Sequence, residues 1–369
     1  MVYNGRTGRS VRQILKDIRG GSVPDETDVL ALLNATGRDT WDVASAADII
    51  REEKAGDDIT WVQNQNINVT NICINSCGFC GFCRKPGDPD TYFFDDETLR
   101  RKVREAKARR VTEICTVSGL HPDFNADSYL SLIRLIRDEA PEIHIHASNP
   151  MEVYYAAKQS GITTEEMLTR MKEAGLGSMC GTAAEILVDD IRKKICPGKI
   201  STGEWIRIIK EAHNLGIQTT ATIMYGSIER PEDIVAHLKI IRDIQEETGG
   251  FTEFVPLSYI HGQTPLFREG LSRAGATGRN DILITAVARF YLDNFTNIQT
   301  SWVKYGTKVV QLCLISGAND IGGTVYEESI SKSAGGKDTE FLDPVEMERM
   351  SEDLGRRLVR RNTLYQKLD

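Results

Sequence analysis

Four of the eight cysteines of the chain fall within the short stretch NVTNICINSCGFCGFCRKPGD. Cys73, Cys77 and Cys80 follow the spacing C-x3-C-x2-C, and Cys83 comes three residues later. Cysteine thiolates are the usual ligands of iron–sulfur clusters, and a [4Fe–4S] cluster offers four irons to such ligands. Three thiolates on one loop therefore predict a cluster whose fourth iron is free to bind a small chelating molecule.

An open iron of this kind is typical of enzymes that use S-adenosylmethionine. The amino and carboxylate groups of that cofactor chelate the free iron, and one electron from the cluster splits its sulfonium to give a 5′-deoxyadenosyl radical. Phe79, directly before the third cysteine, also suits such a loop. Two other classes of protein remain alternatives at this point, a cluster-bearing electron carrier and a zinc-binding protein.

A zinc site would take Cys83 as its fourth ligand. Zinc sites usually join two short ligand hairpins, however, whereas all four thiols here belong to one loop. We therefore expect the cluster ligands to be Cys73, Cys77 and Cys80. Cys83 is left outside this set, as a bystander, a ligand in an inactive form or a reactive thiol.

The composition of the 369-residue chain is that of a globular protein, with 40% hydrophobic and 27% charged residues. The formal net charge of −8 disfavours nucleic acid or an anionic membrane as the main partner, since both require clustered basic residues. No apolar run suits a signal peptide or approaches the roughly 20 residues of a membrane span. We expect a cytoplasmic protein, where clustered cysteines indicate metal or redox chemistry.

The elements that must position this loop alternate along the chain. Residues 1–58 show a helical pattern and are expected to form an N-terminal cap. After them, short β-rich runs alternate with amphipathic helical segments. The expected strands are 64–70, 112–118, 142–147, 176–180, 217–224, 252–257, 297–303 and 310–315.

Eight strands that alternate with helices predict an α/β fold of parallel β-α units, a TIM-type (β/α)8 barrel or an open partial barrel. We assign 59–340 to the barrel and 341–369 to a C-terminal helical extension. Active sites of such barrels lie at the C-terminal ends of the strands. The cysteine loop directly follows the first expected strand, and this position guides the choice of further candidates.

Four residues near strand ends are candidates for binding the cofactor. Ser118 and Gly119 end the second strand and would meet the methionyl amino group, although an ordinary turn has the same composition. Glu185 follows the fourth strand and would accept the ribose hydroxyls; alternatively, it is an acid at a helix N-terminus. Arg192 lies on roughly the same helical face and would meet the cofactor carboxylate, with a surface ion pair as the alternative.

Three residues are candidates for catalysis, namely His121, His146 and Tyr225. His146 lies on the third expected strand, where it would orient a substrate or relay a proton. His121 follows the second strand and would relay a proton near the reacting centre. Each histidine has a plain alternative as a satisfied core residue. Tyr225 comes at the end of the fifth strand.

The candidates for binding the substrate are polar residues elsewhere at strand ends. Asn149 follows the third strand, and Glu253 and His261 lie on or near the sixth. Asn319 and Asp320 begin a glycine-rich stretch that we expect to be a loop after the last strand, suited to close approach by a polar ligand. A surface turn has the same composition.

Several longer stretches resemble one family of radical S-adenosylmethionine (SAM) enzymes. They occur in the family's order from about 55 to 340. They are NVTNIC–SCGFC, HIHASNPMEV, GLGSMCGTAAEIL, ICPGKISTGEW, TTATIMYGSIERPED, GGFTEFVPLSYIHGQTPL and NDIGGTVYEESIS. The chain thus resembles the tyrosine-using subunits of FO synthase, with Cys83 and Cys180 as departures from the family pattern. Aminofutalosine synthase and dehypoxanthine futalosine cyclase are related alternatives.

The resemblance implies a radical SAM transferase of coenzyme F420 biosynthesis. Its cofactors would be a [4Fe–4S] cluster and S-adenosyl-L-methionine, and its substrates L-tyrosine and 5-amino-6-(D-ribitylamino)uracil. Cleavage of the tyrosine Cα–Cβ bond would yield a 4-hydroxybenzyl group that adds to C5 of the uracil. The implied partners are an electron donor and a second radical SAM subunit that closes the deazaflavin ring.

Overall fold

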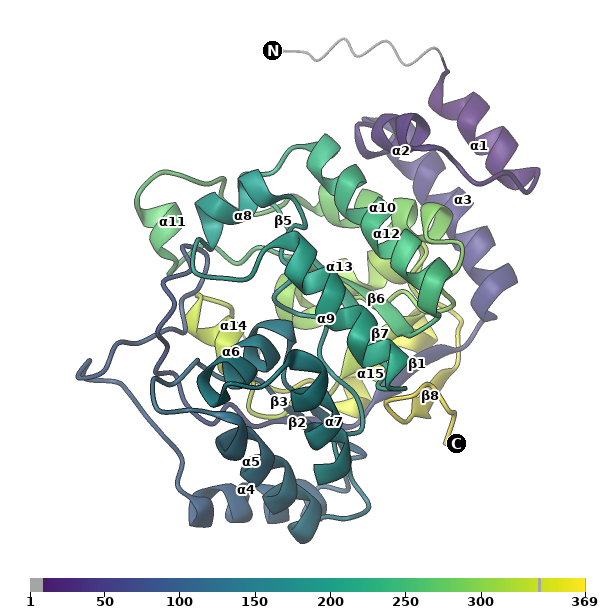
Figure 1. Cartoon of the computed structure of the whole chain (residues 1–369). Helices are drawn as coiled ribbons and strands as arrows, with labels where there is room; N and C mark the ends of the chain where they lie inside the picture. The colour runs from purple at the N-terminus through teal and green to yellow at the C-terminus, as the bar shows by residue number, and fades with distance from the viewer. Residues whose placement is uncertain (1–8, 338–339, 369) are drawn as a thin grey trace.

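The computed structural model describes residues 9–337 and 340–368, which form a ring of parallel strands surrounded by helices (Figure 1). The strands are β1 (Ile59–Val62), β2 (Asn64–Asn66), β3 (Glu113–Thr116), β4 (His144–Ala147), β5 (Thr219–Tyr225), β6 (Phe251–Ser258), β7 (Asp320–Gly323) and β8 (Leu358–Arg361).

Helices precede, connect and follow the strands. The helices are α1 (Val11–Arg19), α2 (Glu26–Leu33), α3 (Arg38–Ala55), α4 (Asp96–Ala108), α5 (Ala126–Glu139), α6 (Pro150–Ser160), α7 (Thr164–Ala174), α8 (Asp189–Ile195), α9 (Thr202–Asn214), α10 (Pro231–Thr248), α11 (Pro265–Arg268), α12 (Gly278–Tyr291), α13 (Trp302–Leu314), α14 (Ile330–Ser333) and α15 (Pro344–Asp353).

The parallel pairings pass all the way round the ring. They run from β2 through β3 to β4, and then through single bridges at Ser178 and Met179 to β5 and β6. Bridges at Ile298 and Gln299 lead on to β7, which pairs with β1, the segment just before β2. Within the described ranges the barrel therefore has eight strand positions and is closed, so the full form of the predicted barrel is the one observed.

Local sequence signals explain where many of the surrounding helices begin and end. Asn149 caps α6 by accepting hydrogen bonds from two backbone N–H groups, and Pro150 follows in the first turn, where its missing N–H costs nothing. Gly161, Gly175 and Gly249 end α6, α7 and α10 in the left-handed conformation, which glycine adopts without steric cost.

Three of the expected elements form a different structure. In addition, the expected strand 297–303 is reduced to bridges at Ile298 and Gln299, and Trp302 and Val303 belong to α13. The run 310–315, predicted as a strand, lies in α13, where Val310, Cys313 and Leu314 form one buried helical face. A short apolar run does not distinguish a buried strand from a buried helix, which explains this error. The glycine-rich stretch predicted as a loop contains β7, so Asp320 lies in a strand and not after one.

The third difference is at the C-terminus, where a helical extension was expected over 341–369, of which residue 369 lies outside the described ranges. The helix α15 ends at Asp353, and Gly355 then takes a left-handed conformation. The chain continues as β8, which pairs with β1 in parallel. Alternate residues of β8 are buried, including Arg361, which reaches the barrel interior.

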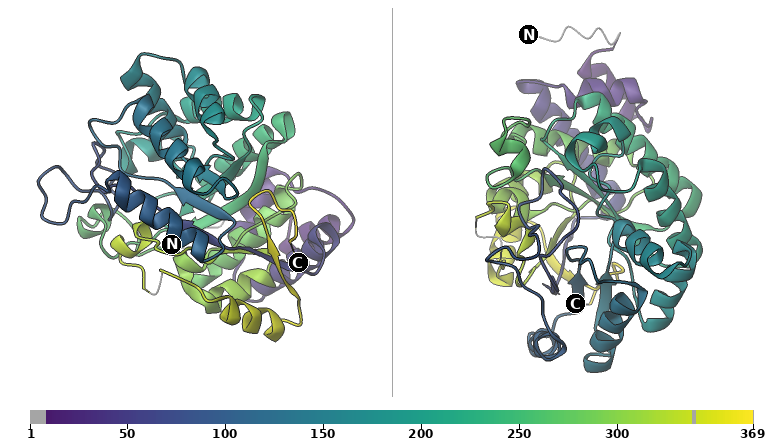
Figure 2. Two further views of the ribbon diagram at one scale, coloured as in Figure 1. Left: turned by 90° about the horizontal axis from the view of Figure 1, so that it is seen from below. Right: turned by 60° about the vertical axis from the view of Figure 1, so that its left-hand side comes forward.

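The three N-terminal helices lie on the outside of the barrel. Helix α2 packs on α10 and α12, α3 packs on α12, and α1 packs on α2 and α3, on the side opposite to α4 and α5 (Figures 1 and 2). Their buried side chains, such as Ile14, Leu32 and Val43, belong to the same hydrophobic cluster as those of the barrel. A smaller cluster joins β1, α13 and α15. Among the described residues, no helix has the length and apolar character that crossing a membrane requires.

Candidate active site

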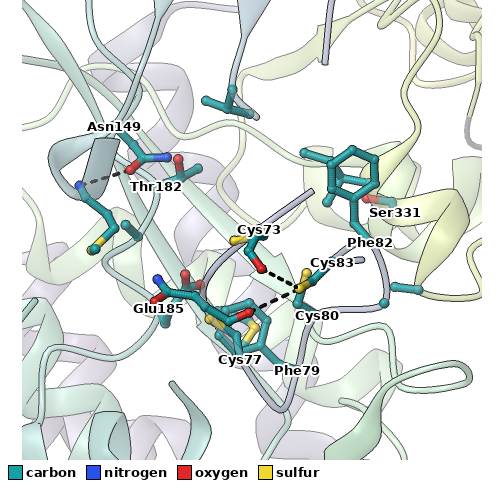
Figure 3. A pocket seen from close by; sticks show the side chains of 18 of the residues that line it. Cys73, Cys77, Phe79, Cys80, Phe82, Cys83, Asn149, Thr182, Glu185 and Ser331 are labelled. Carbon is teal, nitrogen blue, oxygen red and sulfur yellow. Dashed lines mark hydrogen bonds between the residues drawn. The ribbon is translucent and has the colours of Figure 1, made fainter. Parts of the chain in front are cut away.

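A pocket opens at the C-terminal ends of the strands, where chemistry is expected in this fold. The cysteine loop forms one wall (Figure 3). The other walls come from residues after β3 and β4, from the segment 182–199, from the ends of β5 and β6, and from α13, α14 and Ala334 directly after α14. Its lining includes Cys73, Cys77, Cys80, Cys83, Ser118, Gly119, Asn149, Glu152, Thr182, Glu185, Lys199, Met224, Leu257, Ser258, Lys304 and Ser331.

The loop that carries the four cysteines is anchored by its backbone. The amide of Ile74 donates to the carbonyl of Leu120 over 3.0 Å, and that of Gly78 donates to Ile195 over 2.8 Å. The amide of Cys73 donates to the carbonyl of Arg84 over 3.0 Å, which closes the loop on itself. These bonds hold the four thiols in one wall of the pocket.

The spacing of these thiols bears on which metal group they suit. A single tetrahedral zinc would draw its thiolates to about 3.8 Å of one another. Only one group of three or more thiol, imidazole or carboxylate side chains among the described residues has all its ligand atoms within 4.8 Å of one another. That group is elsewhere in the barrel and includes none of the loop cysteines. No three of the loop thiols form such a compact group, so they are not arranged for a single ion, and three thiols on one loop suit a cluster with separate iron corners.

Cys83 differs from the other three in its surroundings. Its thiol lies 3.1 Å from the carbonyl oxygen of Asn75 and close to the thiol of Cys73, and its single proton can be donated to only one of them at a time. A hydrogen bond from Cys83 lowers the pKa of Cys73 to about 6. In the structure Cys83 thus supports the thiolate of a neighbouring candidate ligand.

Ser118 and Gly119 cross closely over the cysteine loop. The Ser118 hydroxyl accepts a hydrogen bond from the amide of Val69 over 2.8 Å. A Cβ on Gly119 would lie 2.2 Å from the carbonyl oxygen of Ile72, so only glycine allows this approach. Both residues line the pocket beside the loop, where the sequence analysis expected them to meet the cofactor.

Glu152 is a pocket residue that the sequence analysis did not identify. One carboxylate oxygen accepts from the Ser118 amide over 3.2 Å, and the other is buried without a partner. Burial raises the pKa of this carboxyl to about 8. A buried acceptor that lacks a donor at the pocket wall suits a ligand with an ammonium or amino group, such as the methionyl end of the expected cofactor.

Glu185 and Lys199 form an ion pair in the same pocket. Burial alone would lower the pKa of Lys199, but the charge of Glu185 raises it above its ordinary value. The ammonium also lies 5.2 Å from the ring centre of Phe79, next to the cluster loop. Glu185 has a left-handed backbone with φ of +46°, which is uncommon for a non-glycine residue and is often found at functional sites.

Arg192 lies behind the pocket wall and does not line it. It is buried, and its guanidinium donates to the backbone carbonyls of Ala183, Ala184 and Ile200. These bonds fix the segment that presents Thr182 and Glu185 to the pocket. Arg192 therefore supports the wall from behind, whereas the sequence analysis expected it to contact the cofactor.

The three candidates for catalysis do not line this pocket. His146 lies deeper in the barrel, where its Nδ1 is 2.7 Å from Ser178 Oγ. Tyr225 is buried and donates to Asp281 over 2.6 Å. His121 packs among aromatic rings at the rim, beside Phe124.

The substrate-binding candidates are divided among three places. Asn149 lines the pocket, where its side chain also caps α6. His261 lines a neighbouring hollow that shares Ser258 and Lys304 with the pocket. Glu253 and Asp320 meet Arg361 near the start of β6 and β7, toward the other end of the barrel. Asn319 lies beside them and accepts hydrogen bonds from Arg289 and the amide of Ile298.

Family models match two parts of the chain. The model of the radical SAM superfamily matches residues 67–241, which include the cysteine loop and the strands β3, β4 and β5. A model described as the CofH/MqnC C-terminal region matches residues 248–369.

Relatives match nearly the full length. A protein of Methanosphaerula palustris is 62% identical over 95% of this chain and 96% of its own, and one of Methanoculleus marisnigri is 59% identical over 96% and 97%. Both are named 5-amino-6-(D-ribitylamino)uracil–L-tyrosine 4-hydroxyphenyl transferase. In fold, the chain is similar to a crystal structure of methylornithine synthase, with a TM-score of 0.73 and 16% sequence identity. The similarity covers 94% of this chain and 97% of the methylornithine synthase chain.

Proposed function

Since the chain belongs to the family of 5-amino-6-(D-ribitylamino)uracil–L-tyrosine 4-hydroxyphenyl transferases, within the radical SAM superfamily, we propose that it carries out their reaction. It cleaves the Cα–Cβ bond of L-tyrosine and adds the 4-hydroxybenzyl group to 5-amino-6-(D-ribitylamino)uracil, a step toward FO and coenzyme F420. The observation that carries this proposal is 62% identity over nearly the whole chain to a relative of that name.

Members of the superfamily use a [4Fe–4S] cluster and S-adenosylmethionine, and the residues of the pocket fit both. Cys73, Cys77 and Cys80 would hold three irons, since their thiols are spread along one anchored loop. Glu152, with its unpartnered oxygen, would accept from the methionyl amino group. When bound, the two cofactors together supply a carbon radical that abstracts hydrogen from the substrate.

The protein side chains position the reactants and keep the pocket dry. Met224 and Leu257 provide an apolar wall, which suits the tyrosine ring and limits access of water. The ammonium of Lys304 lies 2.6 Å from Ser331 Oγ at the pocket edge, and we assign to it the substrate carboxylate. The hydroxyls of Thr182 and Ser258 remain at the wall for polar substrate groups.

The proposed reaction implies partners and a compartment. An electron donor must reduce the cluster, and a second radical SAM subunit would close the ring of the deazaflavin product. All cysteines in the described ranges are free thiols, which agrees with the reducing cytoplasm. We propose neither nucleic acid nor a membrane as a partner, in keeping with the acidic net charge of −8.

A reconstitution experiment tests the proposal. The full chain is loaded anaerobically with iron and sulfide, reduced with dithionite, and incubated with S-adenosylmethionine, L-tyrosine and the ribityl-diaminouracil. Mass spectrometry should find 5′-deoxyadenosine together with a hydroxybenzyl adduct of the uracil, and Cys77→Ala should form neither. An electron carrier or zinc protein would form no deoxyadenosine. If 5′-deoxyadenosine forms only with a substrate of aminofutalosine synthase or of dehypoxanthine futalosine cyclase, the transferase assignment is wrong.

A further inference from the structure

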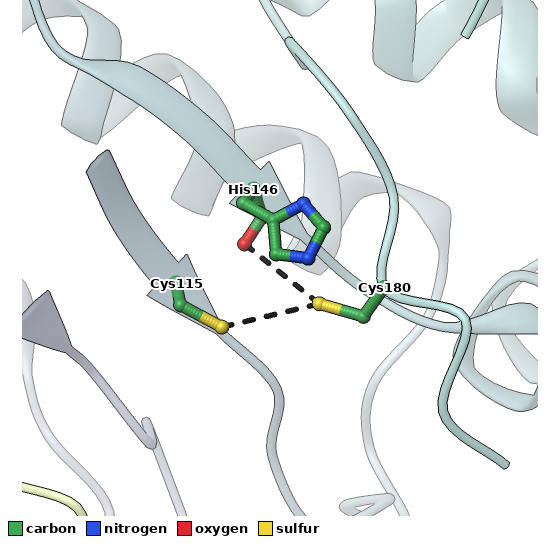
Figure 4. A group of neighbouring side chains, drawn as sticks. All are labelled: Cys115, His146 and Cys180. Carbon is green, nitrogen blue, oxygen red and sulfur yellow. Dashed lines mark hydrogen bonds between the residues drawn. The ribbon is translucent and has the colours of Figure 1, made fainter. Parts of the chain in front are cut away.

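Three metal-ligand side chains meet inside the barrel, away from the cysteine loop. The ligand atoms of Cys115, His146 and Cys180 all lie within 4.8 Å of one another (Figure 4). None of the three residues lines the pocket. His146 and Cys180 are 8% and 4% exposed and Cys115 is half-buried, so two of the three ligands are shielded from bulk solvent.

The strand register explains why these side chains meet. Cys115 on β3 is paired with His146 on β4, and His146 is bridged to Ser178 in the next strand position. Cys180 follows two residues after Ser178, so it points to the same face of its extended segment. Side chains of neighbouring strands at one level fill a layer of the barrel. Ser118, Asn149 and Thr182, which line the pocket, come two or three residues later on the same three segments, so the group lies one layer below the pocket.

The two sulfur atoms are 3.9 Å apart. In a tetrahedral zinc site with Zn–S bonds of about 2.3 Å, two thiolates lie ~3.8 Å apart, so the observed separation needs little adjustment. A disulfide, in contrast, would require the sulfurs to approach to about 2.05 Å.

Hydrogen bonds prepare the imidazole of His146 as a ligand. Its Nδ1 lies 2.7 Å from Ser178 Oγ, and Nε2 of His144 lies 2.8 Å from the same oxygen. A hydroxyl donates one hydrogen bond and accepts others. When His146 Nδ1–H donates to Ser178 Oγ and Ser178 donates to His144, the other nitrogen, Nε2 of His146, is unprotonated. That nitrogen faces the thiols in Figure 4. Metal-bound histidines usually have such a partner on the second nitrogen.

We propose that Cys115, Cys180 and Nε2 of His146 bind a zinc ion in the barrel interior, at a site distinct from the cluster loop. Two thiolates and an imidazole suit zinc and disfavour magnesium or calcium, which prefer oxygen ligands. Both thiols release their protons to solvent as the ion enters, so the occupied site is neutral. This neutrality suits a buried position, where an unpaired charge is costly.

Three protein ligands leave one position of the tetrahedron for a further ligand. A water molecule takes this position in the free protein. Because the ligands come from three successive strand positions, the ion also ties β3, β4 and the segment at Ser178 together beneath the pocket. The site goes beyond the proposed transferase reaction and does not depend on it.

The loop cysteines could also bind zinc, so the test must distinguish zinc at the loop from zinc in the barrel interior. The first arm uses the full chain carrying C73A, C77A, C80A and C83A, equilibrated with zinc and freed of loosely bound metal. Elemental analysis should find one zinc per chain. Adding Cys115→Ser or Cys180→Ser should abolish it, whereas Cys313→Ala, a change to a buried cysteine in α13, should not.

The second arm uses wild-type protein with its cluster reconstituted, so that it does not depend on the folding of a variant. Anomalous diffraction at the zinc edge should place one ion between Cys115, His146 and Cys180. Ser178→Ala, which removes the partner of His146, should weaken zinc binding roughly 10- to 100-fold in a chelator competition.

Three results would overturn the proposal. One is the absence of zinc at these residues in both arms. The second is retention of the ion after Cys180→Ser in the loop variant. The third is a disulfide between Cys115 and Cys180 in protein prepared without oxygen, since it would consume both thiolate ligands.

Discussion

At the scale of single residues, Glu152 joins the proposed cofactor site to the first turn of α6. It lies three residues after the cap Asn149, whose side chain accepts from the Glu152 amide. The carboxyl is therefore held at the pocket wall, with one oxygen on the Ser118 amide and the other unpartnered. A charged donor that enters this place gains a hydrogen bond of about 1.5–3 kcal/mol.

Glu152→Gln should weaken the binding of S-adenosylmethionine to the cluster-loaded enzyme by roughly 10- to 100-fold, because the amide keeps the shape but loses the charge. Equilibrium binding measured anaerobically checks this. The control is Glu165→Gln on the exposed face of α7, which should leave the affinity unchanged. Equal affinities for the wild type and the Glu152 variant would remove this residue from the cofactor site.

The same carboxyl predicts a pH dependence of stability in cofactor-free protein. Its folded pKa of about 8 lies above the ordinary value of 4.5, so the folded state binds the proton more tightly than the unfolded chain. Wild-type stability should therefore fall relative to Glu152→Gln as pH rises from 4.5 to 8, with a slope of at most about 1.4 kcal/mol per pH unit. Urea unfolding at pH 5, 6, 7 and 8 measures the difference, and a wild-type stability that stays constant or rises relative to the variant over this range would contradict the prediction.

Replacing Cys77 and replacing Cys83 should have different effects on cluster assembly. Cys77→Ala removes a proposed iron ligand and should abolish the cluster, as measured by iron and sulfide content after reconstitution. Cys83→Ala should retain the cluster and deoxyadenosine formation, because this thiol supports Cys73 through a hydrogen bond. Equal loss of iron in both variants would make Cys83 a ligand.

Residue spacing was enough to predict the cysteine loop, and placement at the ends of expected strands was enough to predict that Ser118, Gly119, Glu185 and Asn149 lie at the pocket. Glu152 was missed because an acid in the first turn of a helix is ordinarily explained by the helix dipole. Lys199 lies in a turn before α9, and no periodic pattern indicates that it would meet Glu185. Such contacts depend on how separate strands are arranged in the ring, which the sequence does not display.

At the scale of elements, the barrel was predictable where strands and helices have distinct periods. The closure of the barrel was not predictable, because two of the eight strand positions consist of isolated bridges and the sequence of β7 has the composition of a glycine-rich loop. In β7, Asp320 is buried because Arg361 of β8, the Thr60 hydroxyl and the Gly322 amide satisfy its carboxylate. Arg361 lies 41 residues from Asp320 in sequence, so the composition around Asp320 gives no sign of this pairing.

Arg361 should therefore be important for stability. It is 2% exposed and its partner Asp320 is fully buried, so Arg361→Met leaves a buried carboxylate without its cation. We expect the free energy of unfolding to fall by about 3–5 kcal/mol. Denaturant unfolding checks this, with Arg357→Met as the control. The exposed guanidinium of Arg357 pairs with Asp58, and its loss should lower the free energy of unfolding by less than about 1 kcal/mol. Equal effects of the two changes would exclude a special role for the buried pair.

At the scale of the whole molecule, the N-terminal helices and the barrel share one core. Every residue of α12 from Asp281 to Tyr291 is buried, because the barrel covers one side and α2 and α3 cover another. The helical period of 1–58 predicts an N-terminal cap, of which residues 1–8 lie outside the described ranges. Periodicity shows that a helix has an apolar face but does not show which element covers that face.

Unfolding should consequently be a single transition for the described part of the chain. Leu32 on α2 is fully buried in the shared cluster, so Leu32→Ala should lower the stability of the whole molecule by about 2–5 kcal/mol. Calorimetry and hydrogen exchange should show α1–α3 and the barrel strands losing protection together, at a midpoint lower than in the wild type. Trp41→Ala, which changes a side chain that is 55% exposed, should leave that midpoint nearly unchanged. Two separate transitions, with only the earlier one moved by Leu32→Ala, would instead make the N-terminal helices an independent unit.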